Sequence, residues 1–136
     1  NSTEFNKKTT YPVIDLMESQ KAIKAKGGTM RLGAYQCNVK KGTKAFSAYR
    51  KKIISERHRH RWEVNNRFRE RLTKKGLIIS GENSDLNLVE IIELEDHPWY
   101  VAGQFHPELK SRVSKAHPLF REFIKASVKH LNKKKK

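Results

Sequence analysis

Residues 77–105 read LIISGENSDLNLVEIIELEDHPWYVAGQF, and three apolar segments in this stretch decide the fold class. The segments are Leu77–Ser80, Leu88–Leu94 and Trp99–Phe105, with short polar breaks between them. Apolar runs of this length, bounded by Gly, Asn and Asp, are typical of β-strands. Because they follow one another directly, they predict strands that can pair antiparallel.

The segments before residue 77 alternate between extended and helical patterns. Tyr11–Met17 and Thr29–Val39 look extended, and Ile53-Ile54 leads a further extended segment into residues 56–61. Between them, Lys44–Lys52 is predicted to be a short helix, with Phe46 and Tyr49 three positions apart. This alternation favours an α/β class.

Two further helices are predicted from capping residues. Asn66 is a plausible N-cap for a helix that ends at Gly76. A last helix is predicted from Pro118 to about Leu131, because proline is favoured in the first helical turn, and His117 is interpreted as a helix-start residue. One stripe of the last helix carries Leu119, Phe120, Phe123, Ile124, Val128 and Leu131.

Length and composition predict one domain or part of one. The chain has 136 residues, of which 36% are hydrophobic. It has no apolar stretch of about 20 residues and no signal pattern, so we expect a soluble, cytoplasmic protein without a membrane partner. Its single cysteine, Cys37, cannot build a disulfide framework. Because the chain begins at Asn1 without a methionine, we expect it to be cut from something longer.

The net charge of +16 raises the question of nucleic-acid binding. The basic residues are spread along the chain, and six acids without any Lys or Arg lie between Glu82 and Asp96. A surface that binds phosphate backbone more often shows a concentrated basic stripe. We therefore expect a lysine-rich solvated surface and no nucleic-acid partner, with residues 133–136 as a basic tail.

The motif Gln104-Phe105-His106-Pro107-Glu108 places an imidazole and a carboxylate two positions apart. Pro107 pushes His106 into an extended conformation, in which residues i and i+2 share a face. The Glu108 carboxylate can then hold one tautomer of His106 while the other ring nitrogen acts as a base. These are two parts of a nucleophilic triad, and the motif contains no nucleophile.

A second motif, Glu56-Arg57-His58-Arg59-His60-Arg61, alternates with the period of a strand, so its three arginines share one face. One interpretation is recognition of a carboxylate or phosphate, for which guanidinium forks are suited. The other is an exposed edge strand, where like charges discourage aggregation. No spacing typical of a metal site accompanies His58 and His60, so no metal is expected. Glu90 and Glu93, three apart in a strand, should point to opposite faces.

Taken together, these residues resemble the glutamine amidotransferase domain of the CTP synthase family, enzymes that aminate UTP with ammonia drawn from glutamine. The Gln-Phe-His-Pro-Glu motif alone is shared by many class I amidotransferases, including GMP synthase. Two runs, Gly27–Gly33 and Glu56–Arg61, narrow the resemblance to CTP synthase. The matching stretches are 1–5, 27–33, 56–66, 88–93 and 97–108.

The resemblance implies a class I amidotransferase-like, flavodoxin-like layered α/β fold. It assigns residues 1–132 to the C-terminal part of that domain. It also implies a Cys-His-Glu triad, in which His106 and Glu108 are the histidine and glutamate. Glu4 would hold the α-amino group of glutamine and Arg61 its α-carboxylate, as their charges suit. Arg57 and Arg59 receive no role and are interpreted as structural ion-pair partners.

The nucleophile departs from the family pattern. In the family it stands in a glycine-flanked elbow upstream of the Asn1–Phe5 run. Cys37 lacks such an elbow and is predicted to be a buried or half-buried strand residue. We therefore expect that the chain lacks its nucleophile and is inactive alone.

No cofactor is expected in this segment. The resemblance implies that ATP, Mg²⁺ and UTP bind an absent synthetase domain, that GTP activates, and that the full-length enzyme is a homotetramer. Two alternatives stay open: another class I amidotransferase such as GMP synthase, and a non-catalytic basic binding module.

Overall fold

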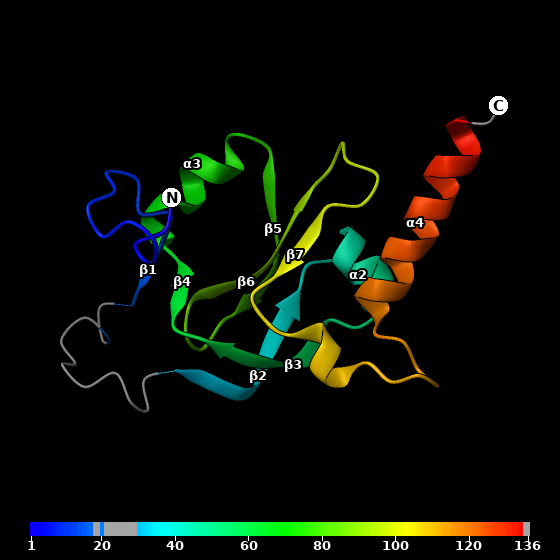
Figure 1. Ribbon diagram of the computed structural model, residues 1–136, viewed down its shortest axis with the longest axis horizontal. Coiled ribbons are helices and arrows are strands. Elements are labelled where there is room, and N and C mark those ends of the chain that lie inside the picture. The colour runs from blue at the N-terminus through cyan, green and yellow to red at the C-terminus, as the bar shows by residue number, and fades with distance from the viewer. Residues whose placement is uncertain (18–19, 21–29, 135–136) are drawn as a thin grey trace.

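A five-stranded antiparallel sheet forms the centre of the molecule, and a two-stranded antiparallel sheet lies beside it (Figure 1). The computed structural model describes residues 1–17, 20 and 30–134. The strand order in the larger sheet is β3-β2-β5-β6-β7. Its strands are β2 (Arg31–Val39), β3 (Ile53–His60), β5 (Leu77–Asn83), β6 (Leu88–Leu94) and β7 (Val101–Gly103). The smaller sheet pairs β1 (Ile14–Leu16) with β4 (Trp62–Val64).

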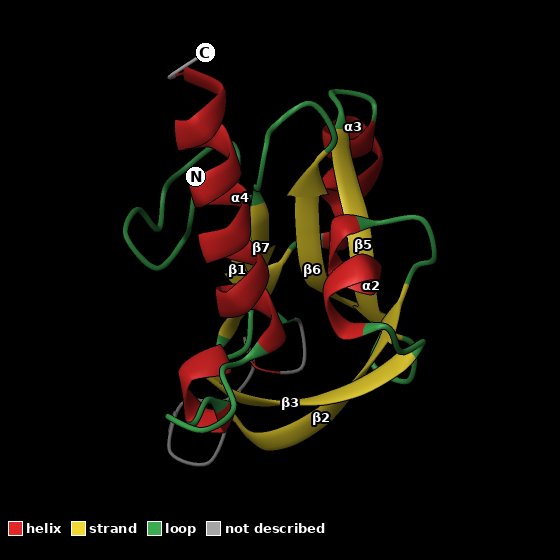
Figure 2. Cartoon of the chain, turned by 90° about the vertical axis from the view of Figure 1, so that its right-hand side faces the viewer, coloured by secondary structure: helices red, strands yellow, loops and turns green. Residues whose placement is uncertain are grey.

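The helices complete an α/β arrangement. Figure 2 shows α2 and α4 together on one side of the larger sheet. The helical segments are α2 (Lys44–Tyr49), η1 (Asn66–Phe68), α3 (Arg69–Thr73), η2 (Pro107–Lys110) and α4 (Pro118–Lys134), of which η1 and η2 are 3₁₀ turns.

The three strands predicted within residues 77–105 are confirmed, and they pair antiparallel in sequence order. Their bounds differ: β5 continues to Asn83, and β7 covers only Val101–Gly103. The β2–β3 hairpin joins this meander through two residues of β2, Asn38 and Val39. The hairpin therefore crosses the meander at a steep angle (Figure 2).

The predicted alternation in residues 56–61 is confirmed in β3. Glu56 and His58 are buried, whereas Arg57 and Arg59 are exposed. Strand β3 is at the edge of the described sheet, as the edge-strand interpretation predicted. Within the described residues neither Arg57 nor Arg59 has an ion-pair partner, so their interpretation as ion-pair residues stays a prediction.

The predicted helix after Asn66 begins one residue earlier. Asn65, not Asn66, is the cap, because its side-chain oxygen accepts from the backbone N–H of Arg67. The Asn65 amide also donates to the carbonyl of Pro12, a partner distant in sequence. The segment starts as η1 and continues as α3 only to Thr73.

Helix α2 is held at its N-terminus by two side chains. Thr43 is its N-cap and accepts from the N–H of Phe46. The buried carboxylate of Glu93, on β6, accepts from the N–H groups of Lys44 (2.9 Å) and Ala45 (3.1 Å). A carboxylate suits the positive end of a helix dipole, so Glu93 fixes α2 onto the sheet.

The core lies between the sheet and the helices α2 and α4. Gly81 shows how closely it is packed, because a Cβ atom there would lie 2.7 Å from the Cys37 Sγ and 2.7 Å from Ile91 Cγ1. Both distances are too short for real contacts, so only glycine fits. The buried core residues are Cys37, Val39, Ala45, Ala48, Ile54, Ile91, Phe105 and Leu119.

Helix α4 starts as predicted at Pro118. His117 is its start residue: its carbonyl accepts from Arg121 N–H and its ring from Leu119 N–H. The helix extends to Lys134. Of the predicted apolar stripe only Leu119 is buried, and no described element covers the others, which are Phe120, Phe123, Ile124, Val128 and Leu131.

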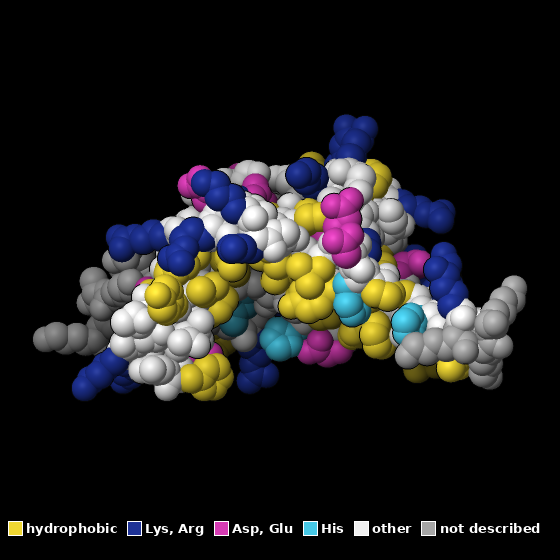
Figure 3. Space-filling view, turned by 90° about the horizontal axis from the view of Figure 1, so that it is seen from above, with side chains coloured by type: hydrophobic (Ala, Val, Ile, Leu, Met, Phe, Trp, Pro, Cys, Tyr) yellow, Lys and Arg dark blue, Asp and Glu magenta, His cyan; other side chains and the backbone are white. Residues whose placement is uncertain are grey.

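The surface is basic without a single basic stripe on the face seen in Figure 3, where Lys and Arg side chains are spread around hydrophobic ones. None of the helices within the described ranges is long and apolar enough to cross a membrane.

The Glu93 contact predicts a stability effect that a neighbour should not share. In Glu93→Gln an amide nitrogen faces one of two buried N–H donors, so we expect the free energy of unfolding to fall by about 1–3 kcal/mol. Urea denaturation followed by circular dichroism measures this. Glu95→Gln, at an exposed position two residues away, is the control and should change stability by less than about 0.5 kcal/mol. Equal effects of both substitutions would contradict the role of Glu93.

Candidate functional site

His106 and Glu108 form a hydrogen-bonded pair at the surface. The Nδ1 atom of His106 lies 2.6 Å from Oε1 of Glu108, and their side chains are 41% and 57% exposed. Because a carboxylate accepts, Nδ1 donates and Nε2 is left as the basic nitrogen. Nε2 has no hydrogen-bond partner within the described ranges, so it is available to exchange a proton.

The backbone around this pair differs in part from prediction. His106 is extended, with φ −105° and ψ 90°, as Pro107 requires. The expectation that the extended chain continues to Glu108 is wrong, because residues 107–110 form the 3₁₀ turn η2. Glu108 therefore reaches the imidazole from the first turn of η2, where proline is favoured.

The pair is fixed to the edge strand β3. The N–H of His106 donates to the carbonyl of Arg57 (2.8 Å), and Lys110 Nζ donates to the carbonyl of Ser55. Two residues earlier, the N–H of Gln104 donates to the carbonyl of Glu90 (3.0 Å). The segment from 104 to 110 thus bridges β6 and β3.

The hydrogen bond from His106 lowers the pKa of the Glu108 carboxyl below its usual range. The carboxylate therefore stays ionised to lower pH than an ordinary glutamate. An ionised Glu108 accepts the hydrogen bond from Nδ1 and so holds the ring in the tautomer whose Nε2 carries no proton.

Glu4 and Arg61 are joined through the small sheet. Glu4 is exposed in the N-terminal loop, and its neighbour Thr3 donates its N–H to the carbonyl of Ile14 in β1 (3.0 Å). Strand β1 pairs with β4, which begins directly after Arg61. Glu4 and Arg61 therefore both lie next to the small sheet, while His106 and Glu108 lie at the η2 turn.

A buried charge cluster lies between the two sheets. The Arg31 guanidinium donates to Glu90 Oε1 (2.6 Å) and to both Glu63 oxygens (3.2 and 3.3 Å). His58 Nε2 lies 2.7 Å from Glu90 Oε2, and His60 Nε2 lies 2.9 Å from Glu63 Oε1. We call these five residues the inner charge cluster. Its imidazole rings are hydrogen-bonded to its carboxylates. Within the described ranges, no group of three or more His, Cys, Asp or Glu is arranged to hold a metal ion.

Another buried carboxylate, Glu56, connects β3 to the start of α4. It accepts from Tyr49 Oη (3.1 Å) and from His117 Nε2 (3.1 Å), and Lys110 Nζ lies 3.8 Å away. Burial raises the pKa of Tyr49, which keeps its hydroxyl a donor. Because Lys110 belongs to η2, Glu56 also supports the turn that carries Glu108.

Cys37 lies in β2 and is fully buried, as predicted. Burial raises the pKa of its thiol to about 12. A nucleophilic cysteine needs a thiolate and access to its substrate. Cys37 has neither, so its role is to pack the core.

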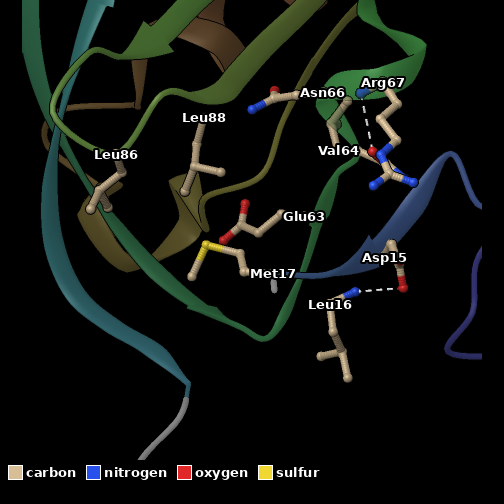
Figure 4. Close-up of a pocket in the computed structure, with 10 residues that line it drawn as sticks. Asp15, Leu16, Met17, Glu63, Val64, Asn66, Arg67, Leu86 and Leu88 are labelled. Atoms are coloured by element: carbon tan, nitrogen blue, oxygen red, sulfur yellow. Dashed lines mark hydrogen bonds between the residues drawn. The ribbon is translucent and has the colours of Figure 1, made fainter. Parts of the chain in front are cut away.

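A hollow of about 280 Å³ opens between the small sheet and the loop before β6. Figure 4 shows Glu63, Met17 and Leu88 directed into it. Neither Glu4, Arg61, His106 nor Glu108 lines this hollow. The hollow is thus separate from the exposed pair of His106 and Glu108, and it meets the inner charge cluster at Glu63.

Sequence reasoning missed part of this arrangement. It placed Glu90 and Glu93 on opposite faces correctly, since Glu90 joins Arg31 and His58 while Glu93 caps α2. It did not find Glu63 or Glu56 as buried partners. The available signal for Glu56 was the alternation in β3, which places Glu56, His58 and His60 on one face. Glu63 is out of phase with this alternation, so no local pattern marked it.

Comparisons with known proteins show the family and the fold of the chain. The family model for glutamine amidotransferase class-I matches residues 3–126. The chain is 63% identical over 127 residues to a CTP synthase of Methanosphaera stadtmanae, covering 93% of this chain and 24% of that protein. It is 61% identical over 127 residues to a CTP synthase of Chlorobium phaeovibrioides, covering 93% and 21%.

A solved structure shares the fold. The Trypanosoma brucei CTP synthase glutaminase domain with bound acivicin superposes with a TM-score of 0.87 at 35% sequence identity. The match covers 95% of this chain and 50% of that chain. The chain thus spans about a quarter of the length of the curated relatives and half of the solved domain. The predicted class I amidotransferase-like α/β fold is confirmed.

The paired geometry predicts the titration of Glu108. Because the folded-state pKa is depressed, we expect the Glu108 carboxyl to titrate at lower pH in the native chain than in the urea-unfolded chain. Carbon-detected NMR of the side-chain carboxyl measures both midpoints. In His106→Ala the midpoint of Glu108 in the native chain should rise, so that most of the difference between the native and unfolded midpoints disappears. Equal midpoints in the native chain and in His106→Ala would contradict the pairing.

Proposed function

Because this chain belongs to the class-I glutamine amidotransferase family and its curated relatives are CTP synthases, we propose that it forms part of a glutaminase site that releases ammonia for the ATP-dependent amination of UTP to CTP. The observation that carries the proposal is the 2.6 Å contact between His106 and Glu108, with Nε2 of the ring unoccupied. This is the arrangement that a base needs beside a nucleophile.

The proposed reaction proceeds through a covalent intermediate. Nε2 of His106 takes the proton of a cysteine thiol, the thiolate attacks the side-chain amide carbon of glutamine, and the C–N bond breaks as Nε2 passes that proton to the leaving ammonia. Water then attacks the thioester and gives a proton to Nε2, and the C–S bond breaks to release glutamate and the thiolate. Glu108 holds the ring orientation and stabilises the imidazolium in both steps.

We assign the substrate's polar ends to Glu4 and Arg61. An α-ammonium requires an anionic partner, which Glu4 supplies, and a planar guanidinium such as that of Arg61 suits an α-carboxylate. The attachment of both segments to the β1–β4 sheet supports this assignment, because the N-terminal loop bonds to β1 and Arg61 directly precedes β4.

The nucleophile in this proposal comes from outside these 136 residues. Cys37, the one cysteine in the sequence, is buried with a raised thiol pKa. Residues 1–132 would then be the part of the amidotransferase domain that supplies the base and the substrate clamp, and residues 133–136 its basic tail. ATP, Mg²⁺ and UTP would bind a synthetase domain elsewhere, with GTP activation and homotetramer assembly as further properties of the whole cytoplasmic enzyme.

The relatives favour this function over the two alternatives. Identity of 63% over 127 residues to a CTP synthase supports CTP synthase over a GMP-synthase-like enzyme. On the face seen in Figure 3 the basic side chains are spread out, so this face offers a basic binding module no concentrated docking stripe.

The role of His106 predicts a split between two ammonia sources. In a full-length CTP synthase carrying these residues, His106→Ala should abolish glutamine-dependent CTP formation, a loss of about 10³-fold or more, and leave ammonia-dependent formation unchanged. Steady-state assays with each nitrogen source measure this. The 136-residue chain alone should release no glutamate from glutamine. Loss of both activities together in His106→Ala would contradict the role.

The role of Arg61 predicts a different kinetic signature. Arg61→Ala should raise the KM for glutamine about 10-fold or more, because a charge-assisted bidentate contact is lost, while ammonia-dependent synthesis is retained. Arg59→Ala is the matched control, since Arg59 is exposed on the same strand-turn segment and should leave the KM unchanged. An unchanged glutamine KM in Arg61→Ala would remove this residue from the site.

A further inference from the structure

We propose that Glu63 is a positioning residue that holds the two halves of the proposed glutamine site in register. The proposal rests on the proposed function. One half is the segment with Arg61, two residues before Glu63, and the other is the segment with His106, two residues after Gln104. Neither the alternation of β3 nor the Gln-Phe-His-Pro-Glu motif pointed to Glu63.

The connection is a direct hydrogen bond. The Gln104 amide Nε2 donates to Glu63 Oε2 at 2.7 Å and also contacts the carbonyl oxygen of Val89. Both partners are acceptors, which fixes the orientation of the Gln104 amide. Gln104 is the residue whose backbone N–H bonds to Glu90, so its main chain and side chain are both held.

Glu63 is saturated by donors. Its Oε1 accepts from His60 Nε2 (2.9 Å) and Arg31 Nη1 (3.2 Å), and its Oε2 accepts from Arg31 (3.3 Å) and Gln104 (2.7 Å). The side chain is 3% exposed. A carboxylate with donors at both oxygens cannot be replaced by an amide without placing an N–H₂ group against a donor.

The geometry explains why such a tie matters for the reaction. Glutamine bound at its α-carbon by the β1–β4 sheet must present its distant amide carbon within reach of Nε2 of His106. That relation depends on β4 and the 104–106 segment keeping their relative position. Misplacement of reacting groups by about 1 Å can lower the rate on the order of 10²-fold. A hydrogen bond that fixes the two segments relative to each other can therefore affect the rate.

The experiment uses four variants of a full-length CTP synthase that carries this chain. Glu63→Gln replaces one acceptor oxygen with an NH₂ group, which then faces a donor. Gln104→Met removes the hydrogen bond between residues 104 and 63 and leaves the pairing of Glu63 with Arg31 and His60 in place. The double variant tests whether the two act through each other. Glu93→Gln is the matched control: its carboxylate is buried to the same extent and accepts two N–H groups, but it holds α2 on the other face of the sheet.

The expected result is a loss of about 10-fold or more in kcat/KM for glutamine in Glu63→Gln and in Gln104→Met, with ammonia-dependent CTP formation unchanged. The double variant should lose little more than either single variant, because both remove one tie. Glu93→Gln should lower the melting temperature without changing kcat/KM for glutamine.

Three outcomes would overturn the proposal: an unchanged kcat/KM in Gln104→Met, losses that multiply in the double variant, or an equal loss in Glu93→Gln. Should Glu63→Gln fail to fold, Gln104→Met against Glu93→Gln carries the test. His106→Ala separates the two levels of inference. If His106→Ala leaves glutamine-dependent synthesis intact, the proposed function fails. If His106→Ala abolishes that synthesis but Gln104→Met leaves kcat/KM for glutamine unchanged, only the positioning role fails.

Discussion

The pairing of two buried carboxylates, Glu63 and Glu90, with the Arg31 guanidinium is the constraint on which the rest of the structure depends. A charge in the interior is tolerated only when it is paired and hydrogen-bonded. Since these partners come from β2, β4 and β6, satisfying them brings the hairpin, the small sheet and the meander to one point. The segment that carries His106 then starts from strands already held there.

The order of strands and helices could be predicted from local sequence because local physics decides it. Period-two alternation identified β3, and the proline after His117 identified the start of α4. The features that could not be predicted depend on hydrogen bonds between residues far apart in the sequence. Asn65 rather than Asn66 caps the turn before α3, since only Asn65 also reaches Pro12, and the capping of α2 by Glu93 joins residues far apart in the chain. The stripe on α4 was placed correctly as a pattern, but a pattern does not say what covers it.

The candidate site divides in the same way. The contact of His106 with Glu108 was predictable because both residues lie within one turn, although the turn is 3₁₀ and not extended chain. Glu63 was not predictable, because its environment is assembled from β2, β3 and the segment after β7. Cys37 could be set aside as a nucleophile from its strand context, and its burial agrees with this. The assignments of Glu4 and Arg61 depend on a family resemblance, since charge alone does not select them among so many basic residues.

The closeness of Gly81 to Cys37 and Ile91 has an evolutionary consequence. A Cβ atom added at residue 81 would lie 2.7 Å from the side chains of both Cys37 and Ile91. Because an added Cβ would meet both side chains, residue 81 can be enlarged only after residues 37 and 91 have both become smaller, so the order in which substitutions can be fixed is constrained. At position 37 this constraint acts through the volume of the side chain, independently of any thiol chemistry.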